Sequence, residues 1–184
     1  MDAALAGGAI AGFVLCVDDP GQAIDALVAR FAPLRTLCAN HATAFIVCDH
    51  LGLALEMGAD GVHLGGGAGD VQAARATLGR ERILGVSCGA SRDAAMVAGE
   101  QGADYVAFGN LGRRPGPEVY ELLRWWSDLF VLPCVAEVAA TVDDCAQLVR
   151  AGADLVAARE GVWTDAEGAA AAVRRLRGAL EAAA

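Results

Sequence analysis

The sequence predicts an α/β fold in which helices alternate with parallel strands. A Gly-Ala-Asp triplet occurs three times, at residues 58–60, 102–104 and 152–154. Each triplet follows a stretch with helical spacing of apolar residues and precedes four or five apolar residues, the length of a buried strand. Glycine tolerates the left-handed backbone that ends many helices, so each triplet predicts a helix end, a tight loop and a strand. Buried strands that alternate with helices indicate parallel pairing with right-handed crossovers.

The remaining elements follow from the same patterns. A short helix within residues 1–10 is expected to stop at Gly7-Gly8 and lead into a strand at residues 12–17. Asp18, Asp19 and Pro20 are expected to cap the next helix, which runs to about Asn40, because proline is favoured in the first turn. Further strands are expected at residues 44–48, 62–64, 83–87, 105–109, 130–135 and 155–158. Further helices are expected at residues 51–57, 71–78, 94–101 and 119–126, after Thr141, and at residues 167–183.

Seven repeated units of this kind predict a single domain over residues 1–184, a TIM-type (β/α)8 barrel that lacks its first strand. An open doubly wound sheet would typically carry a Gly-x-Gly-x-x-Gly turn after its first strand, and the sequence has none there. A barrel without one strand has two unpaired edges, which natural parallel sheets cover. We expect a homodimer to cover them. An upstream start codon and a shift of the seven strands to close the ring are the alternatives.

Composition excludes several classes of protein. The chain of 184 residues is 55% hydrophobic and 20% charged, which excludes a disordered chain. Its net charge of -9, without a cluster of basic residues, argues against nucleic-acid binding. The apolar stretch at residues 5–17 is too short to span a bilayer. The six cysteines lack the close pairing of a zinc ribbon or a small disulfide scaffold, so we expect reduced thiols in a cytoplasmic protein that binds no membrane.

Three motifs resemble one known family. Residues 59–65 (ADGVHLG), 83–87 (ILGVS) and 102–109 (GADYVAFG) are similar, in order and spacing, to thiamine phosphate synthase and the related TenI proteins. The resemblance implies a (β/α)8 barrel and a transferase of thiamine biosynthesis. Such an enzyme joins a pyrimidine pyrophosphate to a thiazole phosphate with the help of Mg²⁺ and releases pyrophosphate. In that frame Met1 begins inside the first helix.

The resemblance also locates the Mg²⁺ ligands. The family's Asn-Asp-Arg after its third strand corresponds to Cys48-Asp49-His50, so Asp49 is the candidate metal ligand. Ala68 stands where the family has its second metal-binding aspartate. Cys16 and Asp18 stand where the family has an arginine and a lysine. Mg²⁺ is therefore implied as a cofactor by the family, but half of its protein anchor is replaced.

The resemblance further suggests which residues bind substrate. Ser87 is retained, and Arg113 and Arg114 lie in the loop that replaces the family's Thr-x-Thr-Lys. Glu137-Val138 replaces a pair of phosphate-binding glycines, and Arg159-Glu160 replaces Ser-Gly. The candidate substrate-binding residues are therefore Ser87, Arg113, Arg114 and Arg159, and no catalytic residue is assigned.

These replacements predict that ordinary synthase activity is lost, since each lost charge-stabilising contact typically costs about 2–4 kcal/mol of barrier. Two alternatives stay open. The first is an active synthase or TenI-like enzyme on a related small phosphorylated ligand. The second is a non-catalytic barrel that binds a protein partner.

Four cysteines are expected at carboxyl ends of strands. Cys16, Cys48, Cys88 and Cys134, with His50 nearby, could form a soft-metal or thiol site. Cysteine is also among the most buried residue types, so small core residues are the simpler interpretation.

Other polar and aromatic residues have structural interpretations beside functional ones. His63 on its buried strand is interpreted as a core histidine, with an acid–base role as the alternative. The aspartates of the three triplets precede their strands, so they are expected to stabilise the amino-terminal face. Trp125 and Trp126 are expected to pack on the barrel, with a partner contact as the alternative for one of them.

Overall fold

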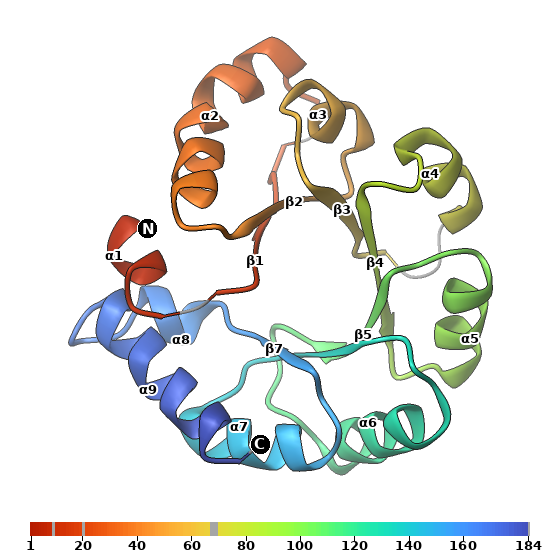
Figure 1. Ribbon diagram of the computed structural model, residues 1–184, viewed down its shortest axis with the longest axis vertical. Coiled ribbons are helices and arrows are strands. Elements are labelled where there is room, and N and C mark those ends of the chain that lie inside the picture. The colour runs from red at the N-terminus through yellow and green to blue at the C-terminus, as the bar shows by residue number, and fades with distance from the viewer. Residues whose placement is uncertain (9, 20, 67–69, 184) are drawn as a thin grey trace.

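A computed structural model describes residues 1–8, 10–19, 21–66 and 70–183. Within these ranges seven parallel strands form one sheet whose spatial order follows the chain, and the helices surround its outer face (Figure 1). The strands are β1 (Gly12–Leu15), β2 (Ala44–Cys48), β3 (Gly61–Leu64), β4 (Ile83–Gly89), β5 (Tyr105–Asn110), β6 (Cys134–Val138) and β7 (Leu155–Ala157). The helices are α1 (Asp2–Leu5), α2 (Ile24–Asn40), α3 (Leu51–Glu56), α4 (Val71–Leu78), α5 (Arg92–Glu100), α6 (Pro117–Leu129), α7 (Val142–Arg150), α8 (Glu160–Trp163) and α9 (Ala169–Glu181).

The sheet curls so that its two edges, β1 and β7, lie at the gap in the ring (Figure 1). Each strand pairs with the next, and the described residues contain no pairing between β1 and β7. Outside this gap Ala4 of α1 packs with Val162 of α8 and Val173 of α9. Val14 on β1 and Leu155 on β7 remain 42% and 43% exposed. The predicted α/β fold with seven parallel strands is confirmed, and its sheet is open between the edge strands.

The three Gly-Ala-Asp triplets share one structure. Their glycines have positive φ angles of 59°, 97° and 102°, the backbone that favours glycine at a helix end. Their aspartates accept a backbone N–H from a neighbouring strand: Phe45 N to Asp60 Oδ2 at 2.7 Å, Leu84 N to Asp104 Oδ2 at 2.8 Å, and Cys134 N to Asp154 Oδ2 at 2.8 Å. The expected structural role of these carboxylates is confirmed.

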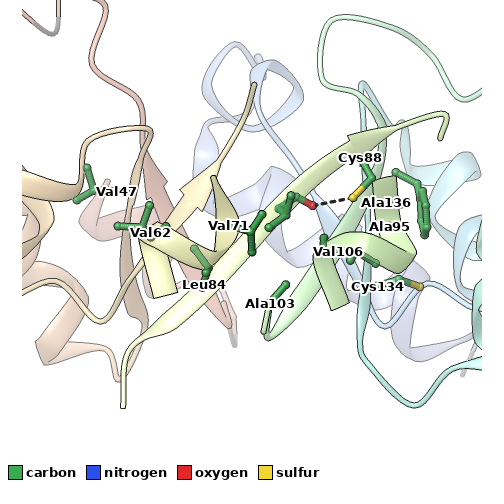
Figure 2. Packing of buried hydrophobic residues seen from close by; sticks show 14 of the residues in the cluster. Val47, Val62, Val71, Leu84, Cys88, Ala95, Ala103, Val106, Cys134 and Ala136 are labelled. Carbon is green, nitrogen blue, oxygen red and sulfur yellow. Dashed lines mark hydrogen bonds between the residues drawn. The ribbon is translucent and has the colours of Figure 1, made fainter. Parts of the chain in front are cut away.

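The core lies between the sheet and the helices. Successive strand residues point to opposite faces, so Leu84 and Val106 turn outward and are fully buried. Figure 2 shows them with Val71 of α4 and Ala95 of α5, within one continuous apolar cluster. The alternate positions of the same strands face the inside of the ring. The inward face is where the polar strand residues gather.

The predicted start of the second helix is wrong. The helix α2 begins at Ile24 with Ala23 as its N-cap, and not at the Asp18-Asp19-Pro20 stretch. The Asp19 carboxylate instead accepts hydrogen bonds from the backbone of Gly21 and the side chain of Gln22. Aspartate readily forms such a local turn, which competes with a helix cap. Pro20 lies outside the described residues.

The strand expected at residues 130–135 is also misplaced. The strand β6 starts four residues later, at Cys134. Phe130 stacks on Trp126 with ring centroids 4.1 Å apart, and Trp126 Nε1 donates to the Leu132 carbonyl at 2.7 Å. The apolar residues 130–132 therefore form the connection from α6. Cys134, expected at the carboxyl end of a strand, lies at the amino end of β6.

The two tryptophans of α6 behave as expected for packing. Trp126 is 1% exposed and belongs to the core. Trp125 is half-buried, lies beneath the Arg92 guanidinium at 4.8 Å, and contacts Phe130 edge-on.

The short helix α8 was not expected from the sequence. None of the helices in the described ranges is long and apolar enough to cross a membrane.

Candidate functional site

Four polar side chains from neighbouring strands form a connected chain inside the ring. The Ser87 hydroxyl on β4 donates to Glu137 Oε2 on β6. Glu137 Oε1 lies 3.4 Å from His63 Nε2 on β3, and His63 Nδ1 lies 2.9 Å from the Tyr105 hydroxyl on β5. We call these four residues the inner polar cluster. Because Ser87 and Glu137 lie near the carboxyl ends of their strands, the cluster reaches the face where β/α proteins bind ligands.

The strand sequences explain how the cluster assembles. His63, Ser87, Tyr105 and Glu137 occupy alternate positions to the outward core residues, so the strand repeat turns all four inward. The Tyr105 ring needs space that Gly85 provides. A Cβ atom at Gly85 would lie 1.9 Å from Tyr105 Cζ, so only glycine fits there. The His63 and Tyr105 rings then stack at 5.7 Å.

Glu137 carries a buried negative charge at neutral pH. Its side chain is 12% exposed. Burial opposes ionisation, but the contacts with His63 and Ser87 outweigh it and hold the pKa of Glu137 below its usual value of 4.5. Burial, with Glu137 nearby, raises the pKa of Tyr105, which stays protonated. The cluster therefore presents an ionised carboxylate between hydroxyl and imidazole groups.

One ring nitrogen of His63 has a hydrogen-bond partner, and the other has none among the described residues. Its side chain is 7% exposed, which agrees with the interpretation of a buried histidine. Nδ1 pairs with the Tyr105 hydroxyl. Nε2 is buried without a hydrogen bond of good geometry among the described residues, so its 3.4 Å approach to Glu137 is an electrostatic contact. A buried imidazole beside a carboxylate is an arrangement that can hold or move a proton, so the acid–base alternative stays open.

Asp49, the candidate metal ligand, follows β2. It has a positive φ of 53°, and its Oδ1 accepts from Gly65 N at 2.8 Å while Oδ2 accepts from the Cys48 thiol at 3.4 Å. It lines a cavity of about 280 Å³ together with Asp70, whose Oδ1 caps α4 by accepting from Ala73 N at 2.8 Å. Position 68, where the resemblance expects a second aspartate, lies outside the described residues. The sequence patterns do not indicate Asp70 as a candidate site residue.

The described residues offer one of the two carboxylates that the family resemblance expects at a Mg²⁺ site. Mg²⁺ is usually held by one or two carboxylates together with waters and substrate phosphates, and each Asp49 oxygen also accepts a hydrogen bond from the chain itself. The described ranges contain no group of three His, Cys, Asp or Glu side chains that could hold a metal ion. The same observation argues against the soft-metal hypothesis for the cysteines, since Cys88 and Cys134 are buried in the core.

The three candidate arginines lie in two different places. Arg113 and Arg114 are exposed in the loop between β5 and α6, and Arg114 forms an ion pair with Asp144 at 3.0 Å. Asp144 lies in the first turn of α7, where Thr141 completes the predicted N-cap. Arg159 is exposed directly after β7. Of the candidate substrate-binding residues, Ser87 alone belongs to the inner polar cluster.

Comparison with known proteins identifies the family. The family model described as thiamine monophosphate synthase matches residues 1–162. The chain belongs to the thiamine monophosphate synthase family. It is 49% identical over 151 residues to the thiamine-phosphate synthase of Erythrobacter litoralis, covering 77% of this chain and 70% of the relative. It is 42% identical over 179 residues to that of Rhodospirillum centenum, covering 92% of this chain and 85% of the relative.

Solved structures agree with this assignment. A thiamine phosphate pyrophosphorylase from Pyrococcus furiosus has a TM-score of 0.84 at 26% identity, covering 99% of this chain and 88% of that protein. The orotidine 5'-phosphate decarboxylase of Pyrococcus horikoshii, at 14% identity, covers 98% of this chain and 91% of that protein with a TM-score of 0.69, which shows likeness of fold alone. The expected resemblance to the thiamine monophosphate synthase family is confirmed.

The sequence did not reveal how the cluster connects. From the sequence alone, Glu137 is expected only as a replacement for a family glycine and His63 as an isolated core residue. Nothing in the sequence patterns indicates a functional role for Tyr105. One available signal was that all three lie at inward positions of their strands. The spatial adjacency of β3, β4, β5 and β6 then brings them together.

Proposed function

We propose that this member of the thiamine monophosphate synthase family has lost ordinary synthase turnover. Its scaffold would be a TIM-type barrel to which the seven described strands belong. The observation that carries the proposal is the hydrogen bond from Ser87 to Glu137. Ser87 is one of the few residues that match the family's ligand face, and its hydroxyl is already engaged by a carboxylate of this chain.

The charge of Glu137 opposes the substrates of the family reaction. Both are phosphorylated, and an anion bound by the Ser87 hydroxyl would have to displace Glu137 and remain close to it. Like charges in a partly buried site repel strongly because little water screens them. The hydrogen bond that Ser87 gives to Glu137 would also be lost.

The neighbouring groups do not compensate for this charge. Arg114 is paired with Asp144, and Asp49 uses both oxygens within the chain. A site that stabilises departing pyrophosphate needs cations or a metal aimed at the developing charge. The side chain that engages Ser87 is an ionised carboxylate instead.

A second candidate function is an active synthase. The relatives at 42–49% identity carry that name, which supports retained turnover. In that case Glu137 would have to rotate out of the inner polar cluster when substrate binds, and Arg113, Arg114 or Arg159 would have to supply the positive charge.

One assay separates the two functions. The chain is incubated with the pyrimidine pyrophosphate, the thiazole phosphate and Mg²⁺, and thiamine phosphate is quantified by chromatography. The Rhodospirillum centenum relative, assayed in parallel, is the positive control. We expect product at least a thousandfold slower than from the relative. Comparable rates would contradict the proposal and favour the second candidate.

We also propose a homodimer in the cytoplasm, in which a second copy covers the open edges. The exposed Val14 and Leu155 on β1 and β7 support this. Light scattering should then give twice the mass of the 18.7 kDa chain. A monodisperse monomer would contradict it.

A further inference from the structure

A pair of cysteines at the end of the first two strands has no part in the proposed function. Cys16 directly follows β1, and Cys48 is the last residue of β2. Leu15 is paired with Val47 in the parallel register of these strands. Continuing that register by one residue brings Cys16 opposite Cys48. Neighbouring strands lie about 4.8 Å apart.

The two side chains are close to each other. The Cys48 thiol donates to Asp49 Oδ2 at 3.4 Å, and Cys16 and Cys48 lie near enough that each thiol alters the pKa of the other. A disulfide requires Cα atoms roughly 4.4–6.8 Å apart and side chains that point toward each other. The strand spacing meets the first requirement, and the shared register turns both side chains to the same face of the sheet, which favours the second.

Access distinguishes this pair from the other cysteines. Cys16 is exposed and Cys48 is half-buried. The remaining four, Cys38, Cys88, Cys134 and Cys145, are all buried. An oxidant in solvent therefore reaches Cys16 first, and the nearest thiol to the oxidised sulfur is Cys48.

The electrostatic surroundings make Cys16 the reactive partner. The neighbouring Cys48 thiol lowers the pKa of Cys16 to about 7, against the opposing effect of burial. Arg159, which follows β7 across the gap in the ring, lowers this pKa further, as does His63, whereas Asp49 raises it. A lowered pKa favours the thiolate form of Cys16, and the thiolate is the nucleophile in thiol oxidation.

We propose that Cys16 and Cys48 form a reversible disulfide that links β1 to β2 when the protein meets a peroxide. The Cys16 thiolate attacks one peroxide oxygen, the O–O bond breaks, and the sulfur becomes a sulfenic acid while hydroxide leaves and takes up a proton as water. Cys48 sulfur then attacks the sulfenic sulfur. The S–S bond forms, the S–O bond breaks, and the leaving hydroxide takes the Cys48 proton as a second water. Two thiols lose two electrons and one hydrogen peroxide becomes two waters.

This linkage would change the ligand face. It removes the thiolate that faces Arg159 and fixes the edge strand β1 to β2 beside Asp49. Disulfides in reducing compartments are usually transient and regulatory, which fits an exposed pair of this kind. The inference is independent of whether the family reaction is retained.

The test is oxidation of the full chain with hydrogen peroxide, followed by digestion with trypsin and tandem mass spectrometry without reduction. We expect a peptide that joins Cys16 to Cys48, lighter than its two parts by two hydrogen atoms and restored by dithiothreitol. Cys48→Ala should abolish it. Cys38→Ala, which removes the buried cysteine of the same tryptic peptide, should leave it intact.

Three outcomes would overturn the proposal. These are the absence of any linked peptide, over-oxidation of Cys16 while Cys48 stays a free thiol, and a linkage that joins two chains on a non-reducing gel. Circular dichroism of each variant shows that it is folded, so a lost linkage reports on the thiol and not on stability.

Discussion

Replacing Glu137 by glutamine removes the negative charge of the inner polar cluster and keeps the size of the side chain. The amide oxygen can still accept from the Ser87 hydroxyl, as Glu137 Oε2 does in the native protein. The protein should therefore remain folded, while an anion at the ligand face no longer meets a carboxylate. We predict that the Gln variant binds the thiazole phosphate more tightly than the native chain.

The structure sets the size of this effect. We take about 5 Å as the separation between an anion that accepts the Ser87 hydroxyl bond and the Glu137 carboxylate that it displaces. With an effective dielectric constant of about 20, one pair of unit charges at that separation repels by about 3 kcal/mol. Because about 1.4 kcal/mol corresponds to a tenfold change, the dissociation constant should fall by about a hundredfold.

Isothermal titration calorimetry with the thiazole phosphate measures this directly. The matched control is Glu100→Gln on α5, which changes the net charge by the same unit at an exposed position remote from the cluster. Its dissociation constant should equal that of the native chain. An unchanged or weaker affinity in Glu137→Gln would refute the idea that the buried carboxylate excludes anions.

Three further predictions follow from individual contacts. The rate of Cys16 alkylation by iodoacetamide should rise with pH and reach half its maximum near pH 7. Cys48→Ala should move this midpoint upward, because the neighbouring thiol that lowers the pKa of Cys16 is lost, and an unmoved midpoint would disprove that cause. Gly85→Ala should lower the free energy of unfolding in urea by about 1–3 kcal/mol or more, since its methyl group enters the Tyr105 ring. Gly178→Ala, in open space on α9, should raise it by about 0.5–1 kcal/mol, and equal effects would contradict the packing argument. Asp104→Ala should cost about 1–3 kcal/mol because the buried N–H of its strand partner loses its acceptor, and a neutral result would remove the structural role of the triplet carboxylates.

Elements with strong local signals were predictable from the sequence. The strand β2 and the helix α4 have the expected bounds, residues 44–48 and 71–78. The N-cap of α7 at Thr141 also has its basis in a few consecutive residues, where Thr141 and Asp144 form a capping box. In these cases sequence neighbours decide the structure.

Elements that depend on distant contacts were not predictable. The start of β6 at Cys134 is set by Asp154 on one side and by the stacking of Phe130 on Trp126 on the other. The start of α2 depends on which group the Asp19 carboxylate binds. Patterns of apolar residues do not encode either choice.

The candidate site divides in the same way. The resemblance to the family selected Ser87 because it ends the matching motif at residues 83–87, and Asp49 because it matches the aspartate of the family's Asn-Asp-Arg. It did not connect Ser87 to Glu137 and His63, since that connection requires the curvature of the sheet to bring β3, β4 and β6 around one interior. The chemical character of the site follows from this connection.

The most direct test of the account is a calorimetric titration of the native chain with the thiazole phosphate and the pyrimidine pyrophosphate in the presence of Mg²⁺, beside the Rhodospirillum centenum relative. The buried charge of Glu137 predicts no saturable heat from the native chain at concentrations that saturate the relative. Micromolar binding of both compounds, followed by formation of thiamine phosphate, would contradict it.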